Sequence, residues 1–236
     1  MADERLLVTV CTYNERENLP ALIPEILQYA PQADVLVIDD NSPDGTGQIA
    51  DEMAARDPRV KVMHRPGKLG LGTATLAGFR FAIDHDYTWV LNLDADFSHH
   101  PRYIPSLMGC ARVSDVVIGS RYMPGGGVVG WGLKRKLMSR GINFYARLFL
   151  RLKTRDNSGA FRCFRVSRLR EIDFDQIISR GYAIQEEILY RCRKIGCTFA
   201  ETPIVFDDRR FGQSKINMRE AALALWIIFR LGVFGR

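Results

Sequence analysis

The chain has 236 residues and a mass of 26.8 kDa, and 47% of its residues are hydrophobic and 25% charged. These values are typical of a globular domain, so they exclude a disordered chain and a coiled coil. The 33 Lys and Arg residues outnumber the 27 Asp and Glu residues, which gives a net charge of +6 and an isoelectric point of about 9.2. This excess favours an anionic partner but does not distinguish nucleic acid, phosphorylated metabolites and a membrane surface.

The cysteine pattern and the first residues predict a protein of a reducing compartment. The five cysteines are scattered and form no C-x-x-C spacing, so we expect neither a disulfide framework nor a zinc site. The first residues lead into a strand without the basic and apolar regions of a signal peptide. We therefore expect a cytoplasmic protein whose site faces the cytosol.

The first half of the chain alternates strand-like and helix-like segments. Short apolar runs rich in β-branched residues predict strands, and apolar residues at helical spacing between them predict helices. This alternation is typical of a doubly wound, mainly parallel sheet with helices on its faces. The predicted strands are 6–11, 35–38, 60–64, 89–93 and 116–118, and the predicted helices begin near 19, 46 and 70.

The second half has a different pattern. Pro124–Gly127 predicts a flexible loop, and Leu133–Leu152 predicts a helix with basic and aromatic residues. A strand near 161–164, a helix over 182–195 and a strand over 198–206 follow. The sequence has no repeat and no Pro/Ser-rich linker between the halves, so we expect a single α/β domain.

The longest apolar stretch runs from Ala221 to Phe234. As a helix at ~1.5 Å per residue it spans roughly 21 Å, which is too short for a hydrocarbon core of ~30 Å. Trp226 and Phe229 suit a membrane interface, and Arg230 can extend to the headgroups. The segment is predicted to be an amphipathic or shallowly inserted helix, although a helix packed on the protein core fits the pattern equally well.

Polar and acidic residues follow four of the five strands predicted in the first half. One such residue is more often a helix cap or turn former, but four strand ends together indicate a ligand. Because ligands of parallel sheets bind at the carboxyl ends of the strands, we expect these side chains in one crevice. They are Tyr13, Glu15, Asp39, Asp40, Asp94, Asp96 and Arg121.

Asp94 and Asp96 form a D-x-D motif at the end of a strand, where side chains two residues apart point the same way. Mg²⁺ and Mn²⁺ bind a few carboxylate oxygens and complete their shell with water and substrate phosphates. The motif therefore suggests a metal-bridged diphosphate. The sequence has no glycine-rich phosphate loop of the dinucleotide-binding or P-loop kind, which argues against a dehydrogenase and a P-loop enzyme.

Five segments, taken together, resemble the dolichol-phosphate (polyprenol-phosphate) mannosyltransferases, which are GT-A-type family 2 glycosyltransferases. Their order and spacing match over nearly the whole chain, which is far more specific than any one motif. The segments are Thr12–Glu15, Asp39–Thr46, Asp94–Pro101, Gly119–Tyr122 and Phe206–Lys215.

The resemblance implies a GT-A-type (Rossmann-like) domain over residues 1–215. Its nucleotide-sugar and metal half would be 1–120, and its acceptor half with a closing loop would be 121–215. A C-terminal amphipathic helix would occupy 216–236.

The implied activity is transfer of mannose from GDP-mannose to a polyprenyl phosphate, with inversion and with Mg²⁺ or Mn²⁺. The protein would lie peripherally on the cytosolic face of a membrane, and a membrane-embedded partner subunit is compatible with the resemblance. Another hexose, such as glucose from UDP-glucose, is the alternative within the fold. A non-catalytic basic module on a membrane or nucleic acid is the alternative of another class. The acid pair, and the lack of aromatic residues interleaved on a basic sheet, argue against it, so we expect no nucleic-acid partner.

The resemblance implies that Asp96 holds the metal, with the Ser98 hydroxyl as a weaker ligand. It also implies that Asp94, Asp96, Arg209 and Lys215 act in catalysis. This is chemically sensible because cations and a metal stabilise the charge of the departing diphosphate. The implied nucleotide-sugar site consists of Thr12, Tyr13, Glu15, Asp40, Asp44, Lys68, Asp94, Arg209 and Lys215.

Arg121, Arg135 and Ser139 correspond to the acceptor-phosphate site of the family. Arg135 and Ser139 are four residues apart, so they share a helix face, and guanidinium groups suit phosphate. A phosphate monoester is largely a dianion at neutral pH, so it is already a nucleophile and needs no general base. A basic face toward anionic lipid is predicted for Lys134, Lys136 and Arg140.

Three further residues match the family, and two adjacent histidines are predicted to have structural roles. The resemblance makes Asp156 a neighbour of the sugar, and Gln185 and Glu187 also match, although Glu187 is equally compatible with an exposed helix position. The adjacent His99 and His100 are predicted to cap and pack rather than to bind a ligand.

Overall fold

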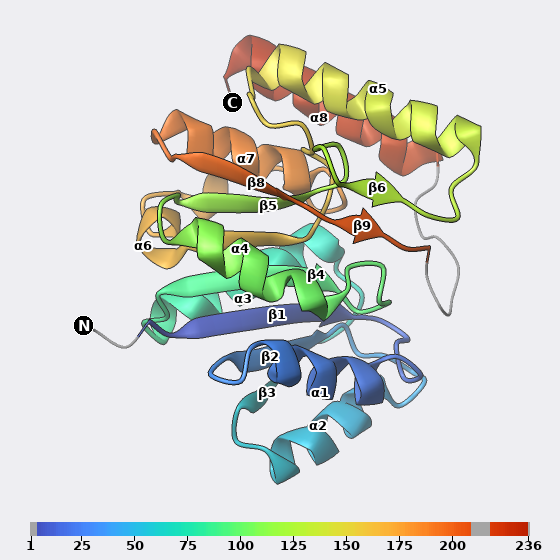
Figure 1. The fold of residues 1–236 in the computed structure, drawn as a ribbon, viewed down its shortest axis with the longest axis vertical. Coiled ribbons are helices and arrows are strands. Elements are labelled where there is room, and N and C mark those ends of the chain that lie inside the picture. Colours follow the sequence, from blue (N-terminus) through green and yellow to red (C-terminus); the bar gives the residue numbers. More distant parts are fainter. Residues whose placement is uncertain (1–3, 209–217, 236) are drawn as a thin grey trace.

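The computed structural model describes residues 4–208 and 218–235. Its centre is a seven-stranded sheet, whose strands run across the middle of the molecule in Figure 1. The strands are β1 Leu6–Thr12, β2 Asp34–Asp39, β3 Val60–His64, β4 Trp89–Asp94, β5 Val116–Ser120, β7 Arg162–Arg165 and β8 Phe199–Pro203.

The strand order is β3-β2-β1-β4-β7-β5-β8. All neighbouring pairs are parallel except the two made by β7, which lies antiparallel between β4 and β5. The predicted mainly parallel sheet is confirmed. Each predicted strand of the first half forms, and its carboxyl end lies at the same edge as the others.

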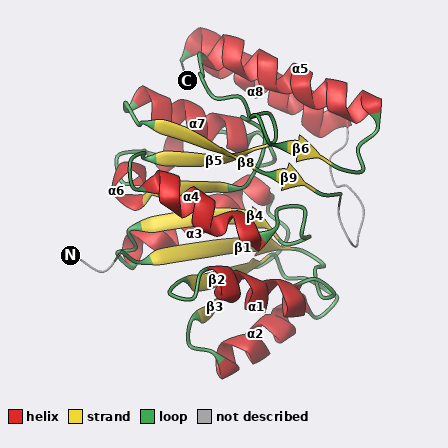
Figure 2. Cartoon of the chain, viewed as in Figure 1, coloured by secondary structure: helices red, strands yellow, loops and turns green. Residues whose placement is uncertain are grey.

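Helices cover both faces of the sheet (Figure 2). Because successive side chains of a strand point to opposite faces, Val8 and Val10 enter one apolar cluster and Leu7 the other. The cluster of Val8 packs under α1 Leu19–Tyr29, α2 Thr46–Arg56 and α4 Ile104–Ala111. The opposite cluster packs under α3 Leu71–Asp84, α6 Val166–Leu169 and α7 Ile184–Lys194, and single turns of 3₁₀ helix lie at Pro101–Tyr103 and Phe174–Gln176.

Two long helices, α5 (Leu133–Leu150) and α8 (Met218–Phe234), pack side by side beyond α7. A Cβ on Gly232 would lie 2.5 Å from the carbonyl oxygen of Phe149, so this close approach of the two helices requires glycine. On α8, the residues Ile228 and Leu231 are fully buried in the core. The helix predicted at the C-terminus therefore does pack on the protein. None of the helices described is both long enough and apolar enough to span a membrane.

The structure differs from the predicted boundaries where local chain chemistry intervenes. The strand predicted over 198–206 breaks after Pro203, and its end, β9 Val205–Phe206, leaves the main sheet. β9 pairs in parallel with β6 Gly127–Val128, so the predicted flexible loop ends in a short strand. The helix predicted to reach residue 152 ends at Leu150, because Arg151 adopts a left-handed φ of 53° at its C-cap.

Candidate active site

The carboxyl ends of β1, β2 and β4 border a cavity of about 330 Å³. Of the seven side chains expected in one crevice, five line this cavity, whereas Asp39 and Arg121 are not among its lining residues. The far wall comes from residues distant in sequence: Gly181 and Tyr182 before α7, and Glu220 of α8. The predicted residues that line the cavity are Thr12, Tyr13, Glu15, Asp40, Lys68, Asp94 and Asp96.

The acidic pair lies at the end of β4. The Asp96 carboxylate is buried, and its Oδ1 accepts hydrogen bonds from the backbone N–H of Ser98 at 3.1 Å and from its hydroxyl at 2.5 Å. The Asp94 side chain keeps 34% exposure. Phe97, between them and Ser98 in sequence, has a φ of 62°, which is strained for a bulky residue and is the kind of outlier that marks functional sites. The Ser98 hydroxyl thus orients Asp96; its role as a metal ligand stays a prediction.

The donor set of this pair suits a hard divalent cation. Among residues 4–208 and 218–235, no group of three His, Cys, Asp or Glu residues is placed to hold a metal ion. Asp94 and Asp96 could therefore hold Mg²⁺ or Mn²⁺ together with phosphate oxygens and water, which is the usual arrangement of these ions at phosphate sites.

His99 and His100 have the packing and capping roles predicted for them. The His99 ring is buried beside Phe161 and Phe206, at centroid distances of 5.4 and 5.1 Å, and His100 accepts a hydrogen bond from the N–H of Arg102. His99 also makes a contact that the sequence did not indicate, because its Nδ1 lies 3.3 Å from Oδ2 of Asp94. The buried His99 ring therefore contacts the acidic pair from the protein interior.

The cavity residues Tyr13, Glu15, Asp40 and Lys68 are those predicted to bind the nucleotide sugar at the ends of β1 and β2 and after β3. The Lys68 ammonium lies 4.2 Å from the centroid of the Tyr13 ring, a cation–π distance. Glu15 accepts a hydrogen bond from the Asn18 side chain at 2.9 Å, which fixes its carboxylate beside the start of α1.

Two acidic residues predicted near this group, Asp39 and Asp44, accept hydrogen bonds from the protein itself. Asp39 accepts from the hydroxyls of Thr12 and Ser42, so it holds the turn after β2, and Asp40 faces the cavity. Asp44 is not among the described residues that line the cavity. It accepts hydrogen bonds from the backbone N–H and the hydroxyl of Thr46 at the start of α2. Burial alone would raise the pKa of Asp44, but these hydrogen bonds outweigh burial and lower that pKa. A nucleotide contact of Asp44 stays a prediction.

The three residues predicted for the acceptor phosphate lie around Trp131 and Tyr122. The guanidinium carbons of Arg135 and Arg121 lie 4.2 and 5.4 Å from the centroid of the Trp131 ring. The Tyr122 hydroxyl donates to the Ser139 hydroxyl at 2.6 Å. Arg135 also forms an ion pair with Asp208 at 3.1 Å and keeps 38% side-chain exposure.

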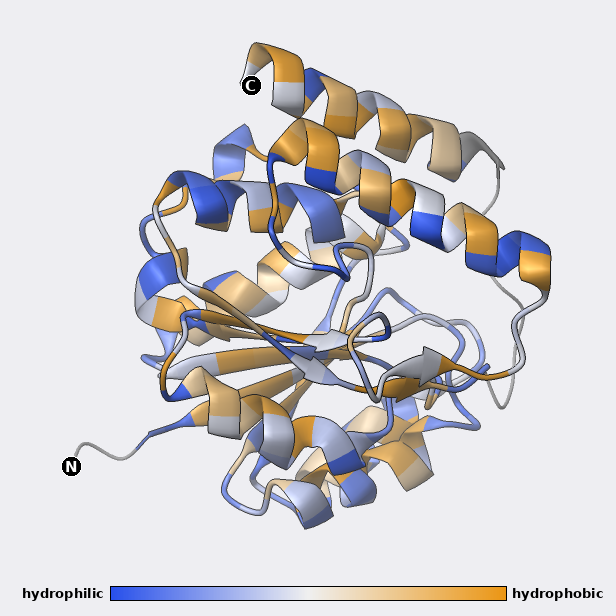
Figure 3. Cartoon of the chain, turned by 45° about the horizontal axis from the view of Figure 1, so that its top comes forward, coloured by the Kyte–Doolittle hydropathy of each residue, from blue (hydrophilic) through white to orange (hydrophobic). Residues whose placement is uncertain are grey.

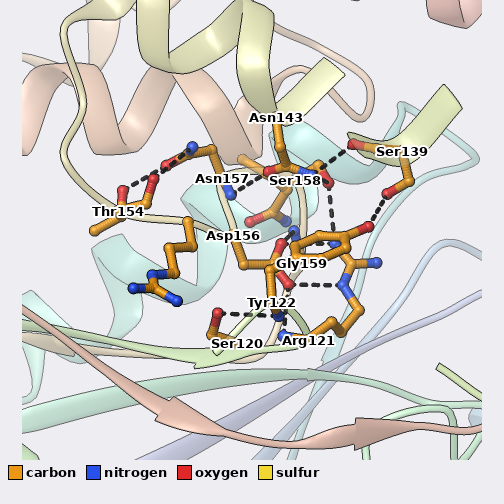
Figure 4. Close-up of polar contacts among 12 residues, drawn as sticks. Ser120, Arg121, Tyr122, Ser139, Asn143, Thr154, Asp156, Asn157, Ser158 and Gly159 are labelled. Atoms are coloured by element: carbon orange, nitrogen blue, oxygen red, sulfur yellow. Dashed lines mark hydrogen bonds and ion pairs between the residues drawn. The ribbon is translucent and has the colours of Figure 1, made fainter. Parts of the chain in front are cut away.

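Arg121 is held by a buried ion pair that Figure 4 shows at its centre. Its Nε and Nη2 donate to the two carboxylate oxygens of Asp156 at 2.7 and 2.6 Å, and its backbone N–H donates to the same carboxylate. Burial alone would raise the pKa of Asp156, but the Arg121 charge outweighs it and lowers that pKa. Burial is likewise outweighed for Arg121, whose pKa is raised chiefly by Asp156 and more weakly by Asp94. The Arg121 guanidinium lies 5.6 Å from the ring centroid of Phe206, and Phe206 packs on His99, which contacts Asp94.

Asn143 connects α5 to the loop that carries Asp156 (Figure 4). Its amide nitrogen donates to the Ser139 carbonyl and the Ser158 hydroxyl, and its oxygen accepts from the N–H of Asn157 at 2.5 Å. Ser158 in turn accepts from Arg121 at 3.0 Å. Arg121 and Ser139 are therefore parts of one hydrogen-bonded unit, whereas Arg135 bonds to Asp208. No sequence pattern indicated Asn143.

The residues of α7 that match the family are buried. Glu187 is fully buried, not exposed, and accepts hydrogen bonds from the N–H groups of Ile178 and Ser179. The Gln185 carbonyl accepts from Arg162, a fully buried arginine of β7. Burial raises the pKa of Glu186 to about 7, although Arg162 opposes this shift. The predicted residues Arg209 and Lys215 lie outside the described residues.

The chain belongs to the glycosyl transferase family 2, whose model matches residues 7–173. It is 41% identical over 232 residues to the undecaprenyl-phosphate mannosyltransferase of Micrococcus luteus, with 98% of this chain and 96% of that protein covered. It is 40% identical over 235 residues to the polyprenol monophosphomannose synthase of Mycolicibacterium smegmatis, with 99% and 89% covered. Family membership makes the chain an enzyme and overrules the non-catalytic alternative.

Solved structures confirm the GT-A fold. Glucosyl-3-phosphoglycerate synthase from Mycobacterium tuberculosis, in complex with phosphoglyceric acid, matches with a TM-score of 0.69 at 18% identity, over 96% of this chain and 80% of that one. The same enzyme with Mn²⁺ and UDP-glucose matches with a TM-score of 0.65 at 19% identity, over 98% and 79%.

We predict that Asp156→Asn destabilises the fold by ~3 kcal/mol at neutral pH, because it leaves the buried Arg121 without its counter-charge. Since the folded-state pKa of Asp156 is lowered, its stabilisation is present above the unfolded pKa of ~3.9 and is lost as the pH falls through the lower folded value. The difference between wild type and variant should therefore shrink in acid. Urea unfolding at several pH values measures it.

Asp175→Asn is the matched control, because Asp175 pairs with Arg80 in a surface ion pair and its side chain is 86% exposed. Its effect should stay below ~1 kcal/mol. Equal losses for the two variants would contradict a stabilising role of the buried pair.

Proposed function

We propose that this enzyme transfers a mannosyl residue from GDP-mannose to a polyprenyl phosphate at a membrane surface. The observation that carries the proposal is the connection between the acidic cavity and the arginine-rich group around Trp131: His99 contacts both Asp94 of the cavity and Phe206, which packs against Trp131. A donor diphosphate with its metal fits the acidic cavity, and a phosphate acceptor fits the arginine-rich group. The names of the relatives from Micrococcus luteus and Mycolicibacterium smegmatis support mannose as the sugar and a polyprenyl phosphate as the acceptor.

On this proposal, the nucleoside lies against Tyr13 and Asp40, and the diphosphate lies beside Asp94 and Asp96. A divalent ion bound there supplies positive charge that stabilises the departing nucleoside diphosphate. The structures of glucosyl-3-phosphoglycerate synthase with Mn²⁺ and UDP-glucose support such an ion in this fold. The Asp96 carboxylate is the better anchor because it is buried and its orientation is fixed by Ser98.

On the acceptor side, Arg135 and Ser139 are placed to contact the phosphate directly. Arg135 is partly exposed, and its present partner Asp208 is also half exposed, so a phosphate dianion can replace that carboxylate. Arg121 is largely committed to Asp156 through Nε and Nη2. It contributes a fixed positive charge, with Nη1 as its remaining donor group.

The proposed reaction is one in-line displacement. A phosphate oxygen of the acceptor forms a bond to the anomeric carbon of the sugar while the bond from that carbon to the diphosphate breaks, so the configuration inverts. The acceptor is already largely a dianion, so the residues need not remove a proton. Their contribution is alignment and electrostatic stabilisation.

Figure 3 shows hydrophobic residues together with hydrophilic ones along α5 and α8, and we propose that the exposed apolar side chains of these two helices lie on the membrane. We call these exposed side chains the apolar platform. The segment Leu133–Leu150 contains no Asp or Glu, and the exposed cations Lys134, Arg140 and Arg147 surround its apolar residues, as expected for anionic headgroups. The platform consists of Leu133, Leu137, Met138, Phe144, Leu148, Leu223, Leu225, Trp226, Val233 and Phe234, each at least 40% exposed.

We predict that Asp96→Asn lowers sugar transfer by roughly 10³-fold and leaves the unfolding temperature near that of wild type, because it removes the main anchor of the metal. The assay uses labelled GDP-mannose, Mn²⁺ and a short polyprenyl phosphate. Chelator should reduce wild-type activity similarly. Full activity of the variant in chelator would contradict the metal role, and faster transfer from UDP-glucose would contradict the donor.

We predict that Arg135→Ala raises the KM for the lipid phosphate by ~10-fold and leaves the KM for the nucleotide sugar near that of wild type, because it removes charge-assisted hydrogen bonds. Arg56→Ala is the control, because it removes an exposed cation of α2 that belongs to neither the acceptor group nor the membrane contact; its side chain is 78% exposed. Equal increases of both KM values would refute the division into donor and acceptor sides.

We predict that the double variant Leu137→Glu/Phe144→Glu lowers binding to anionic phospholipid vesicles by at least roughly tenfold, because burial of each side chain contributes ~1.5–3 kcal/mol. Activity on a short, soluble acceptor should persist. Val113→Glu is the control, since Val113 is an 81% exposed apolar residue after α4 and away from the platform. Unchanged vesicle binding would exclude the platform as the membrane contact.

A further inference from the structure

The nucleoside end of the cavity is supported by a charged residue that does not line it. Arg65 follows β3, and its Nη1 donates to Oδ1 of Asp40 at 2.6 Å. Both side chains are only 8% exposed. Asp40 lines the cavity, so Arg65 holds this carboxylate from the protein side.

Arg65 is itself fixed by a second contact. Its Nη2 donates to the Thr73 hydroxyl at 2.5 Å, and that hydroxyl lies 2.8 Å from the Gly70 carbonyl, to which it donates. Thr73 belongs to the first turn of α3, and the backbone N–H of Arg65 donates to the Asp39 carbonyl. The fork of the guanidinium thus connects β2, the loop after β3 and α3 at one point.

The charges around Asp40 make this contact necessary for an ionised carboxylate. Burial raises the pKa of Asp40 and Asp39 adds to this, whereas Arg65 and the backbone N–H of Leu69 oppose it. Cys11, on the adjacent strand, has its pKa raised to about 12 by burial and by Asp94 and Asp40, so it is a neutral thiol and adds no charge. Lys68, Glu15 and Asp94 also line the cavity. Arg65 is the cation in direct contact with Asp40 among the described residues.

We propose that Arg65 is a positioning residue of the nucleobase site: with Thr73 it holds Asp40 ionised and in one orientation, as an acceptor for the N–H groups of guanine. An ionised carboxylate only accepts hydrogen bonds. Guanine offers two adjacent donors, its ring N–H and its amino group, on one edge. Uracil offers a single N–H between two carbonyl oxygens, which repel a carboxylate. The inference rests on the proposed nucleotide-sugar donor and names the group that selects its base.

The test is calorimetric binding of GDP and UDP, with Mg²⁺, to the full chain from about pH 8 to about pH 5.5. Arg65→Met should weaken GDP binding by roughly tenfold or more at the high pH, because a buried carboxylate loses its partner. The loss should grow as the pH falls, because Arg65 opposes the rise in the pKa of Asp40 caused by burial, and its removal therefore favours the protonated carboxyl. UDP binding should weaken less, and the KM for the lipid acceptor should not change.

Three further variants separate positioning from folding. Arg59→Met is the matched control, because Arg59 pairs with Asp57 on the surface before β3, and it should bind GDP like wild type at every pH. Arg65→Lys keeps the charge without the fork, and Thr73→Val removes the second contact. The GDP affinity of both variants should lie between those of wild type and Arg65→Met. These two variants replace Arg65→Met in the test if it does not fold.

The inference fails if Arg65→Met binds GDP as tightly as Arg59→Met does. If Arg65→Met does not fold, the inference fails when Arg65→Lys and Thr73→Val bind GDP as tightly as Arg59→Met. It also fails if GDP and UDP binding weaken equally and without pH dependence, since that is the result of a merely structural role. Wild type that binds neither nucleotide, or binds UDP more tightly, would instead refute the proposed donor. The binding measurements on wild type alone distinguish that outcome from a failure of the Arg65 inference.

Discussion

The structure is governed by the crowding of carboxylates at one edge of the sheet. Asp39 and Asp40 lie at the end of β2, Asp94 and Asp96 at the end of β4, and both strands pair in parallel with β1 between them, so the charges cannot move apart without unravelling the strands. Buried negative charge is unfavourable unless it is hydrogen-bonded or paired. The contacts that compensate each carboxylate therefore determine where loops turn, which helices begin there and which groups remain for a ligand.

The protein compensates these carboxylates unequally, and the differences define the site. Asp39 is satisfied by hydroxyls, and Asp156 by a bidentate arginine, so both act as structural elements. Asp40 is paired on one side only and faces the cavity on the other. Asp94 and Asp96 also line the cavity, and Ser98 fixes the orientation of Asp96. On the proposed function, a divalent cation bound with the donor adds positive charge beside these two carboxylates.

Local patterns predicted the strands and the residues at their ends, because an apolar run that stops at a turn is encoded within a few residues. Partnerships across the sequence were not predictable in this way. Arg121 and Asp156 are 35 residues apart, Asp40 and Arg65 are 25 apart, and each pair depends on the register of strands that no local pattern fixes. Glu187 resembled a solvent-exposed helix residue because its buried partners, the N–H groups before α7, carry no side-chain signature. Glu220 reached the cavity only through the packing of α8.

The proposed acceptor site and the proposed membrane contact are two faces of the same helix. Arg135, Ser139 and Asn143 follow each other at four-residue spacing on the inner side of α5, and the apolar platform occupies its outer side. A helix with its side chains is ~10–12 Å wide. A headgroup layer is roughly 5–8 Å deep on each side of the hydrocarbon core, from the total and core thicknesses of a bilayer. If the platform lies on the acyl boundary, the inner face of α5 therefore lies near the outer limit of the headgroups. A lipid phosphate can reach Arg135 there while its polyprenyl chain stays in the bilayer, so α5 itself sets the depth at which the sugar is transferred.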